Sequence, residues 1–261
     1  MPDVLRTDDG AVRTLTLNRP DARNALNMGL LKALRTELKA AAAETGIRCL
    51  VLTGAGKGFS AGADVKEWAE VAAKGGGGAA YDWVGEAHAM VQEVAAFPVP
   101  TLAVLNGTAV GAGLDMALAC DFRFAAEEAT FICAYTRMGY NPDAGGTWFL
   151  PRLIGLAAAK RFVYTAEPWT AAQALAAGML TEVHPLATLA AAGQAFAARL
   201  ANGPTVALRQ DKALLEAAFG RSLAEQLKAE KASGDICGKS KDAAEAIAAA
   251  VEKRAPRFTG A

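Results

Sequence analysis

The chain has 261 residues, of which 52% are hydrophobic and 21% are charged, and this composition is typical of a globular protein and not of a disordered one. Lys and Arg together number 27, as do Asp and Glu, so the overall charge gives no reason to expect binding to nucleic acid or to an anionic membrane. The length suits one large domain, or one domain with a helical extension.

The N-terminal segment and the cysteines indicate a reduced, cytoplasmic setting. The first ten residues, MPDVLRTDDG, are polar and acidic and lack the apolar stretch of a signal peptide. No segment is apolar over the length that a membrane span needs. The four cysteines (Cys49, Cys120, Cys133 and Cys237) show neither a CxxC pair nor metal-ligand spacing. We therefore expect a cytoplasmic protein with free thiols and no metal site.

The first predicted elements are a strand and a helix. Residues 12–17 alternate polar and apolar side chains, which predicts a strand, and residues 18–21 form a turn. The helix that follows should bury one face, which carries four leucines: Leu30, Leu31, Leu34 and Leu38.

Two junctions then repeat the order strand, glycine-rich turn, helix. A strand over residues 47–53 runs into GAGKGFSAGADVKE (54–67), and a strand over residues 101–105 runs into NGTAVGAGLDMALACD (106–121). The start of a helix leaves backbone N–H groups without partners at the positive end of the helix dipole. Two such junctions in one chain predict an oxyanion hole with two N–H donors.

The remaining elements complete an α/β pattern. The glycine run at residues 74–78 predicts a surface loop. Residues 121–125 and 130–133 are expected to form short strands. From residue 157 onward the pattern is helical, apart from a short strand at residues 180–184. Alternating strands and helices predict an α/β fold, and the tail predicts a helical extension.

Other motifs near the first junction fit less well. In GAGKGF the third glycine of a GxGxxG motif would fall on Phe59, and Lys57 precedes Gly58 where a Walker lysine precedes Ser or Thr. The segment GFSAG satisfies GxSxG, so an alternative is a hydrolase with Ser60 as nucleophile and His184 as base. That motif needs its serine directly after a strand, and glycine-rich residues intervene here.

Three aspartates lie next to predicted helix starts. Asp64 resembles an N-cap with a capping-box partner at Glu67. Asp115 falls in the first turn of its helix, where it either stabilises the helix dipole or lies beside a substrate carbonyl. Asp143 either caps the helix that contains Trp148 or acts as an acid/base.

Five segments together resemble the crotonase superfamily, the enoyl-CoA hydratase/isomerase family. They are LNRPDARNAL (17–26), VLTGAGKGFSAGADVKE (51–67), NGTAVGAGLDMALACDFRFA (106–125), GYNPDAGGTWFLPRLIG (139–155) and EKRAPRFTG (252–260). The resemblance implies a crotonase-like spiral of ββα units with the acyl-CoA site over residues 1–195. It also implies a C-terminal helical region over residues 196–261 that builds a homotrimer, often paired into a hexamer.

The resemblance also implies the residues of the site. The substrate would be an acyl-CoA thioester, and no separate cofactor is expected because coenzyme A is part of the substrate. The oxyanion hole carries over to the N–H groups of Ala63 and Ala112, the latter standing where glycine is usual. Substrate and coenzyme A contacts carry over to seven positions: Arg23, Ala25, Ala61, Asp64, Val65, Lys66 and Tyr135.

Departures from the family pattern bear on the chemistry. Hydratases of the family place two glutamates around a water molecule, and here those positions hold Asp115 and Tyr135. An aspartate instead stands at Asp143, where family isomerases carry their acid/base. Its segment resembles the phenylacetate-pathway isomerase, which turns an epoxyphenylacetyl-CoA into an oxepin-CoA. The family's chlorobenzoyl-CoA dehalogenases also carry an aspartate here, as a nucleophile.

These residues lead us to expect an acyl-CoA isomerase with Asp143 as acid/base. Asp143 would move a proton of an unsaturated acyl-CoA while the oxyanion hole stabilises the enolate, and Asp115 would rank second. Three alternatives stay open: an enoyl-CoA hydratase that uses Asp115, an aryl-CoA dehalogenase with Asp143 as nucleophile, and a non-catalytic acyl-CoA binder.

Overall fold

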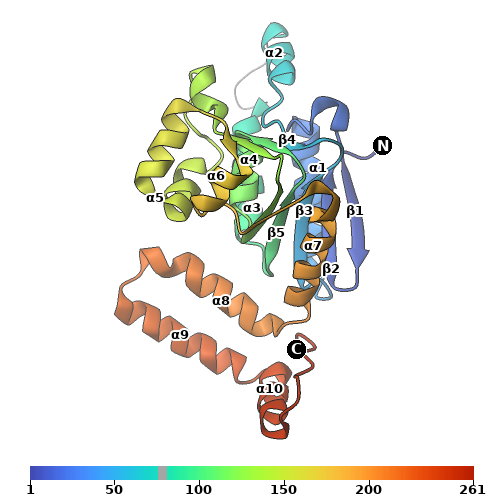
Figure 1. The fold of residues 1–261 in the computed structure, drawn as a ribbon, viewed down its shortest axis with the longest axis vertical. Helices are drawn as coiled ribbons and strands as arrows, with labels where there is room; N and C mark the ends of the chain where they lie inside the picture. Colours follow the sequence, from blue (N-terminus) through green and yellow to red (C-terminus); the bar gives the residue numbers. More distant parts are fainter. Residues whose placement is uncertain (76–80) are drawn as a thin grey trace.

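The computed structural model describes residues 1–75 and 81–261 and has an α/β fold built on two sheets (Figure 1). The six-stranded sheet has the order β1–β2–β3–β5–β7–β10, in which only the β1–β2 pair is antiparallel. Its strands are β1 (Val4–Asp9), β2 (Val12–Leu17), β3 (Cys49–Gly54), β5 (Thr101–Leu105), β7 (Phe122–Ala126) and β10 (Glu182–His184).

The second sheet has four short strands in the order β4–β6–β8–β9. They are β4 (Gly58–Ser60), β6 (Thr108–Val110), β8 (Thr130–Ile132) and β9 (Trp169–Thr170). Each of the first three follows a strand of the larger sheet in the chain, so β3–β4, β5–β6 and β7–β8 are successive ββ units. Because β3, β5 and β7 are neighbours in one sheet and β4, β6 and β8 in the other, the chain winds as a spiral of ββα units.

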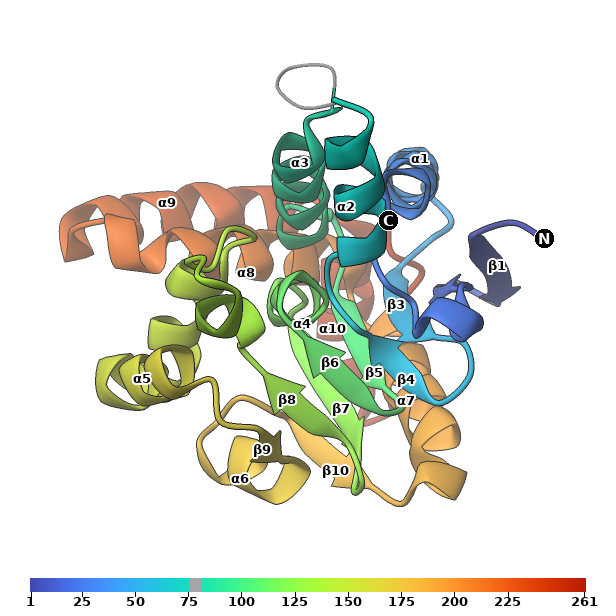
Figure 2. The ribbon, with the colours of Figure 1, turned by 90° about the horizontal axis from the view of Figure 1, so that it is seen from above.

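Helices surround the sheets, and Figure 2 shows α1 and α3 on one side of the larger sheet and α7 on the other. The α-helices are α1 (Met28–Ala43), α2 (Val65–Ala73), α3 (Trp83–Ala95), α4 (Ala112–Leu118), α5 (Gly146–Thr165), α6 (Ala171–Ala176), α7 (Leu186–Ala201), α8 (Thr205–Ala217), α9 (Leu223–Cys237) and α10 (Lys241–Glu252). Short 3-10 helices are η1 (Pro20–Ala22), η3 (Ala134–Met138) and η4 (Ala218–Gly220). Every residue of α4 is buried, so this helix lies inside the fold.

Several predicted elements are confirmed. The strand over residues 101–105 has the predicted bounds, and the four leucines of α1 are buried on one face. The two junctions differ from the prediction in one respect, since β4 or β6 lies between each glycine turn and its helix. The glycine run predicted as a loop extends into residues 76–80, which lie outside the described residues.

The C-terminal helices α8, α9 and α10 extend away from the two sheets (Figure 1). Helix α7 runs through the predicted boundary between residues 195 and 196 and packs on β3, β5 and β7, so the helices that leave the core begin with α8. Large apolar side chains on this region are exposed: Leu215, Phe219, Leu223, Leu227, Ile236, Ile247 and Val251.

The described part of the chain was compared with the expectations for cysteines, metal sites and membrane-spanning helices. All four cysteines are free, and Cys237 alone among them is only partly buried. Within residues 1–75 and 81–261, no three His, Cys, Asp or Glu side chains gather as a metal site would require. No helix in the same part of the chain combines the length and the apolar character needed to cross a membrane.

Candidate active site

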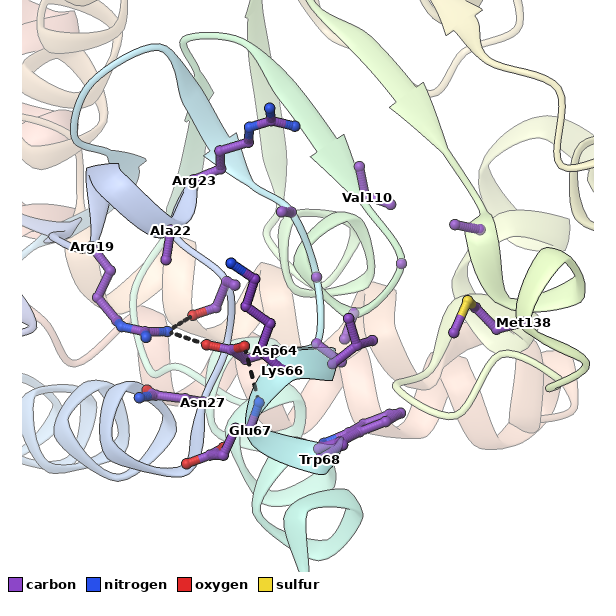
Figure 3. Close-up of a pocket in the computed structure, with 18 of the residues that line it drawn as sticks. Arg19, Ala22, Arg23, Asn27, Asp64, Lys66, Glu67, Trp68, Val110 and Met138 are labelled. Atoms are coloured by element: carbon purple, nitrogen blue, oxygen red, sulfur yellow. Dashed lines mark hydrogen bonds and ion pairs between the residues drawn. The ribbon is translucent and has the colours of Figure 1, made fainter. Parts of the chain in front are cut away.

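A pocket of about 810 Å³ lies where the two glycine junctions meet (Figure 3). Its wall is formed by residues before α1, by the β4–α2 loop, by the β6–α4 loop and by η3 with the segment after it. Ten of the eleven predicted site residues line it: Arg23, Ala25, Ala61, Ala63, Asp64, Val65, Lys66, Ala112, Tyr135 and Asp143. The exception is Asp115, which is not part of the pocket wall.

The two predicted oxyanion donors lie next to glycines with positive φ. Gly62 has φ +83° and Gly111 has φ +49°, backbone conformations that residues with a Cβ rarely adopt. A Cβ on Gly62 would lie 2.7 Å from the Val110 carbonyl oxygen and 3.6 Å from the Ala112 nitrogen, so the two loops touch. Among the backbone hydrogen bonds of the described residues, the N–H groups of Ala63 and Ala112 donate none. Two free donors therefore lie at one wall of the pocket.

Ser60 supports this wall through its hydroxyl group. Its Oγ donates to the Asn24 carbonyl oxygen at 2.8 Å and accepts from the Gly62 N–H at 3.2 Å, and the side chain is buried. His184 lies on β10 of the other sheet, where its Nε2 is 2.9 Å from the Glu182 carboxylate. The hydrolase alternative is therefore wrong, because Ser60 is already bonded within the loop and His184 lies on a different sheet.

Asp64 caps α2, as predicted, but the capping box is incomplete. Its carboxylate accepts from the Glu67 N–H at 3.3 Å and from Arg19 Nη1 at 2.9 Å (Figure 3). The Glu67 carboxylate does not return to Asp64; it accepts from the Met28 N–H at 2.9 Å and from the Tyr81 hydroxyl at 2.7 Å. The side chain of Asp64 thus joins α2 to the segment before α1.

Two cationic side chains line the pocket and form no ion pair within the described residues. Arg23 and Lys66 are exposed, and neither forms an ion pair with any described residue. Figure 3 shows them on one side of the pocket, with Met138 on the opposite side. Exposed cations in this arrangement suit the phosphate groups of an elongated anionic ligand.

Asp143 lies in the pocket wall with one carboxylate oxygen unsatisfied. Its Oδ1 is buried and has no hydrogen-bond partner among the described residues. Burial raises the pKa of this carboxyl, although the nearby His88 and the Tyr135 hydroxyl act in the opposite direction. Of the two alternatives for Asp143, capping of α5 is wrong, because α5 begins at Gly146 after Gly145 and has no side-chain cap.

Asp115 lies deeper, behind Tyr135. It is 1% exposed, and its Oδ2 accepts a hydrogen bond of 2.7 Å from the Tyr135 hydroxyl. Burial raises the pKa of Asp115 to about 7; the charge of Asp143 adds to this, and hydrogen bonds from Tyr135 and the Gly146 N–H oppose it. Burial and the Asp115 carboxylate raise the pKa of Tyr135, so its hydroxyl keeps its proton at neutral pH.

Aromatic side chains that the sequence analysis did not single out also line the pocket. Trp68 on α2 packs edge-on against Trp83 at 5.1 Å and against Tyr140 at 6.4 Å between ring centroids. The indole Nε1 of Trp68 is buried without a hydrogen-bond partner in the described part of the chain. Trp68 lies one helical turn after the Asp64 cap. This spacing could have placed it, from the sequence alone, beside the predicted coenzyme A contacts. Trp148, by contrast, is 42% exposed and does not line the pocket.

Comparisons with known proteins identify the family of the chain. The family model described as enoyl-CoA hydratase/isomerase matches residues 7–261. The 1,2-epoxyphenylacetyl-CoA isomerase of Escherichia coli K12 is 36% identical over 100% of this chain and 99% of its own length. The 2,3-dehydroadipyl-CoA hydratase of the same organism is 36% identical over 100% of both chains. The crystal structure of an enoyl-CoA hydratase from Bacillus anthracis has a TM-score of 0.92 at 32% identity and covers 99% of this chain and 100% of that chain. The chain thus belongs to the enoyl-CoA hydratase/isomerase family, within the crotonase superfamily.

Proposed function

We propose that this member of the family is an acyl-CoA isomerase that moves a double bond with Asp143 as its acid/base. The observation that carries the proposal is the contrast between the two aspartates. Asp143 lines the pocket wall and its buried Oδ1 has no hydrogen-bond partner in the described part of the chain, whereas Asp115 lies behind Tyr135 and is absent from that wall. A base must reach the proton that it removes, and of these two aspartates only Asp143 lines the pocket.

The oxyanion hole would stabilise the enolate that forms when the proton leaves. The thioester oxygen would accept hydrogen bonds from the N–H groups of Ala63 and Ala112. These groups are fixed before the reaction by the backbone turns at Gly62 and Gly111, so little reorganisation is needed as charge develops. The loss of one such donor typically costs about 2.7–4 kcal/mol of transition-state stabilisation.

A single carboxylate would complete both proton transfers. Asp143 removes the α-proton of a β,γ-unsaturated thioester, and the electron pair of the C–H bond forms the enolate. The same proton then returns to the γ-carbon as the conjugated thioester forms. Because burial raises the pKa of Asp143, the carboxylate is a stronger base than an exposed one and its conjugate acid is less prone to lose the proton to solvent.

Different residues of the pocket wall suit the coenzyme A part and the acyl part of the substrate. Arg23 and Lys66 would bind the phosphates of coenzyme A, since both are exposed cations without ion-pair partners among the described residues. Trp68, Met138 and Tyr140 would contact an apolar acyl group. The relative named 1,2-epoxyphenylacetyl-CoA isomerase supports an unsaturated or epoxy acyl-CoA, and no metal or redox cofactor is required for this step.

A hydratase that uses Asp115 is the second candidate, because a relative named 2,3-dehydroadipyl-CoA hydratase has the same 36% identity. Water addition needs one group to activate water and another to deliver a proton. In that case Asp115 would have to act through Tyr135, because the Tyr135 hydroxyl already donates a hydrogen bond to Asp115 Oδ2. A dehalogenase would use the unpartnered oxygen of Asp143 as a nucleophile, so the choice of substrate distinguishes it from the isomerase.

The test is a paired assay of wild type, Asp143→Asn and Asp115→Asn on β,γ- and α,β-unsaturated acyl-CoAs, with aryl and alkyl acyl groups. We expect double-bond migration to fall by about 10²–10⁴-fold in Asp143→Asn. Glu128→Gln, at an exposed position between β7 and β8 and outside the pocket wall, is the control. If migration survives in Asp143→Asn and is lost in Asp115→Asn, our assignment is wrong. Halide release from a haloaryl-CoA would favour the dehalogenase.

We also propose that the C-terminal helices build a homotrimer, or a hexamer of two trimers. Leu223, Leu227 and Ile247 are exposed on helices that extend away from the core, and large exposed apolar patches are typical of subunit interfaces. Light scattering on the purified protein tests this directly. A monomer at micromolar concentration would contradict the proposal.

A further inference from the structure

The segment that carries Asp143 has little hydrogen bonding of its own. Residues 141–144 lie between η3 and α5 and belong to no helix or strand. Among the hydrogen bonds of the described residues, the backbone of this segment takes part in two. One is local, from Asn141 Nδ2 to the Pro142 carbonyl oxygen at 2.9 Å. The other links Asp143 to His88 on α3, 55 residues away in the sequence. The position of Asp143 therefore depends on contacts from outside its segment.

The His88 contact joins a ring nitrogen to the main chain of Asp143. Its Nε2 lies 2.6 Å from the Asp143 carbonyl oxygen. A carbonyl oxygen can only accept a hydrogen bond, so Nε2 carries a proton and is the donor. That donor is present in the neutral Nε2–H tautomer and in the protonated ring, so the bond does not depend on the charge of His88. Because Nε2 already carries a proton, it cannot take one from a substrate, and its role is to hold the chain.

Helix α3 is anchored at two points and gives His88 a fixed support. The Trp83 indole Nε1 donates to the Leu26 carbonyl oxygen at 2.7 Å, which ties the start of α3 to the segment before α1. Glu93, further along α3, forms an ion pair of 2.9 Å with Arg35 on α1. A side chain on such an element is held more accurately than one on a loop, so α3 suits a residue that positions another.

A second contact holds the same segment against α3. Gly145 has φ +95°, and a Cβ there would lie 3.3 Å from Val91 Cγ1. Val91 follows His88 by three residues, so the two side chains are neighbours on one face of α3. The turn after Asp143 thus packs against α3 while His88 holds the carbonyl oxygen. Together the two contacts restrict how the segment can rotate.

We propose that His88 is a positioning residue that fixes the backbone of Asp143, so that the carboxylate stays at the pocket wall. This inference rests on the proposed role of Asp143 as acid/base. One carboxylate has to reach two carbons of the acyl chain in turn, and a displacement of about 1 Å can lower the rate by about 10²-fold. Arg23 and Lys66, the proposed coenzyme A contacts, lie on other segments. Loss of the His88 contact should therefore lower kcat and leave KM nearly unchanged.

The first experiment compares the kinetics of His88→Ala and His88→Gln. Both variants remove the imidazole and any charge that it carries, but the glutamine amide nitrogen can replace the ring Nε2 as donor. The difference between them therefore reports the hydrogen bond and not the electrostatic effect of the ring on Asp143. We expect kcat for double-bond migration to fall roughly 10–100-fold in His88→Ala and to recover for the most part in His88→Gln. Gln92→Ala, at an exposed position one turn further along α3 and outside the pocket wall, is the control.

A second measurement observes the bond without catalysis. The sequence has three Asp–Ala pairs, at 21–22, 143–144 and 242–243. Labelling of the aspartate carbonyl carbon with ¹³C and of alanine with ¹⁵N therefore gives three carbonyl resonances in an HNCO spectrum of the full-length protein without substrate. The variant Asp143→Asn assigns one of them. We expect this resonance to move in His88→Ala while the other two stay in place, and to stay near its wild-type position in His88→Gln.

The outcomes separate the positioning role from the proposed function. An unmoved Asp143 resonance in His88→Ala would overturn the positioning role, as would an unchanged kcat in that variant. Equal losses of kcat in His88→Ala and His88→Gln would also overturn it, because the cause would then be a packing defect and not a lost donor. If migration survives in Asp143→Asn, the acid/base assignment fails, although the Asp143 resonance would still report the contact. If migration is lost in Asp143→Asn but kept in His88→Ala, the isomerase stands and the positioning role is refuted.

Discussion

The substitution Gly62→Ala should lower both the stability of the fold and the rate of catalysis, because it displaces one of the two N–H donors of the proposed oxyanion hole. Gly62 precedes Ala63, has φ +83° and lies against the loop that carries Ala112. An added Cβ would be 2.7 Å from the Val110 carbonyl oxygen, whereas ordinary contacts begin at 3.4 Å. The loop must therefore move by about 0.7 Å, and the movement pulls the Ala63 N–H away from the Ala112 N–H.

Two separate costs follow from this change. An alanine at positive φ destabilises the fold by about 1–2 kcal/mol, which lowers Tm by about 2–4 °C per kcal/mol in a chain of this size class. The displaced donor weakens enolate stabilisation, and the loss of one donor lowers kcat by about 10²–10³-fold. We expect a loss of kcat near the lower end of that range, because the Ala63 N–H is moved and not deleted.

A steady-state assay with thermal melts measures both costs. Gly10→Ala is the matched control, because Gly10 has φ +58° in the β1–β2 turn and a Cβ there would meet nothing within 4 Å. It should lower Tm similarly and leave kcat unchanged. If Gly62→Ala keeps its kcat, or if Gly10→Ala loses as much, the two N–H groups do not form the oxyanion hole that we describe.

Further predictions concern binding, pH and the N-terminal hairpin. Lys66→Ala should raise KM about 3–10-fold with little change in kcat, and added salt should affect wild type more than the variant. Because burial raises the pKa of Asp143 above 3.8 and a base must be ionised, kcat/KM should fall as pH drops through that raised value, which a pH–rate profile will show. Arg13 is buried and lowers the pKa values of Asp8 and Glu44 through hydrogen bonds. Arg13→Met should therefore lower Tm most above pH 4.5, and the difference from wild type should disappear as pH falls below the lowered pKa values. A pH-independent difference would refute that account.

The sequence predicted the strands and helices that have strong local patterns. Residues 101–105 are five apolar or β-branched residues between turns, and the strand has those bounds in the structure. The short strands β4 and β6 were not predicted, because three residues next to glycine carry no periodicity and are held by pairing with distant strands. Local rules also misplaced the start of α5, where Gly145 at φ +95° takes the cap position in place of Asp143.

The candidate site was predictable as a set of pocket residues but not as a hydrogen-bond network. The resemblance placed Ala63, Ala112 and Asp143 on segments that the fold brings to one pocket. It could not tell that Asp115 is sealed behind Tyr135, because that depends on how η3 packs over α4. For the same reason the sequence did not separate the two aspartates, which differ in burial and partners and not in residue type.

The contact between Asp115 and Gly146 restricts how this active site can be redesigned. Any side chain at position 146 would place a Cβ 2.5 Å from Asp115 Oδ1, and a glutamate at position 115 would carry its carboxylate one carbon further toward the same backbone. Installing the two-glutamate arrangement of a hydratase therefore requires changes at position 135 and a repositioned start of α5, in addition to the change at 115. Laboratory evolution toward water addition should consequently stall at single substitutions and succeed only where several of these positions are randomised together.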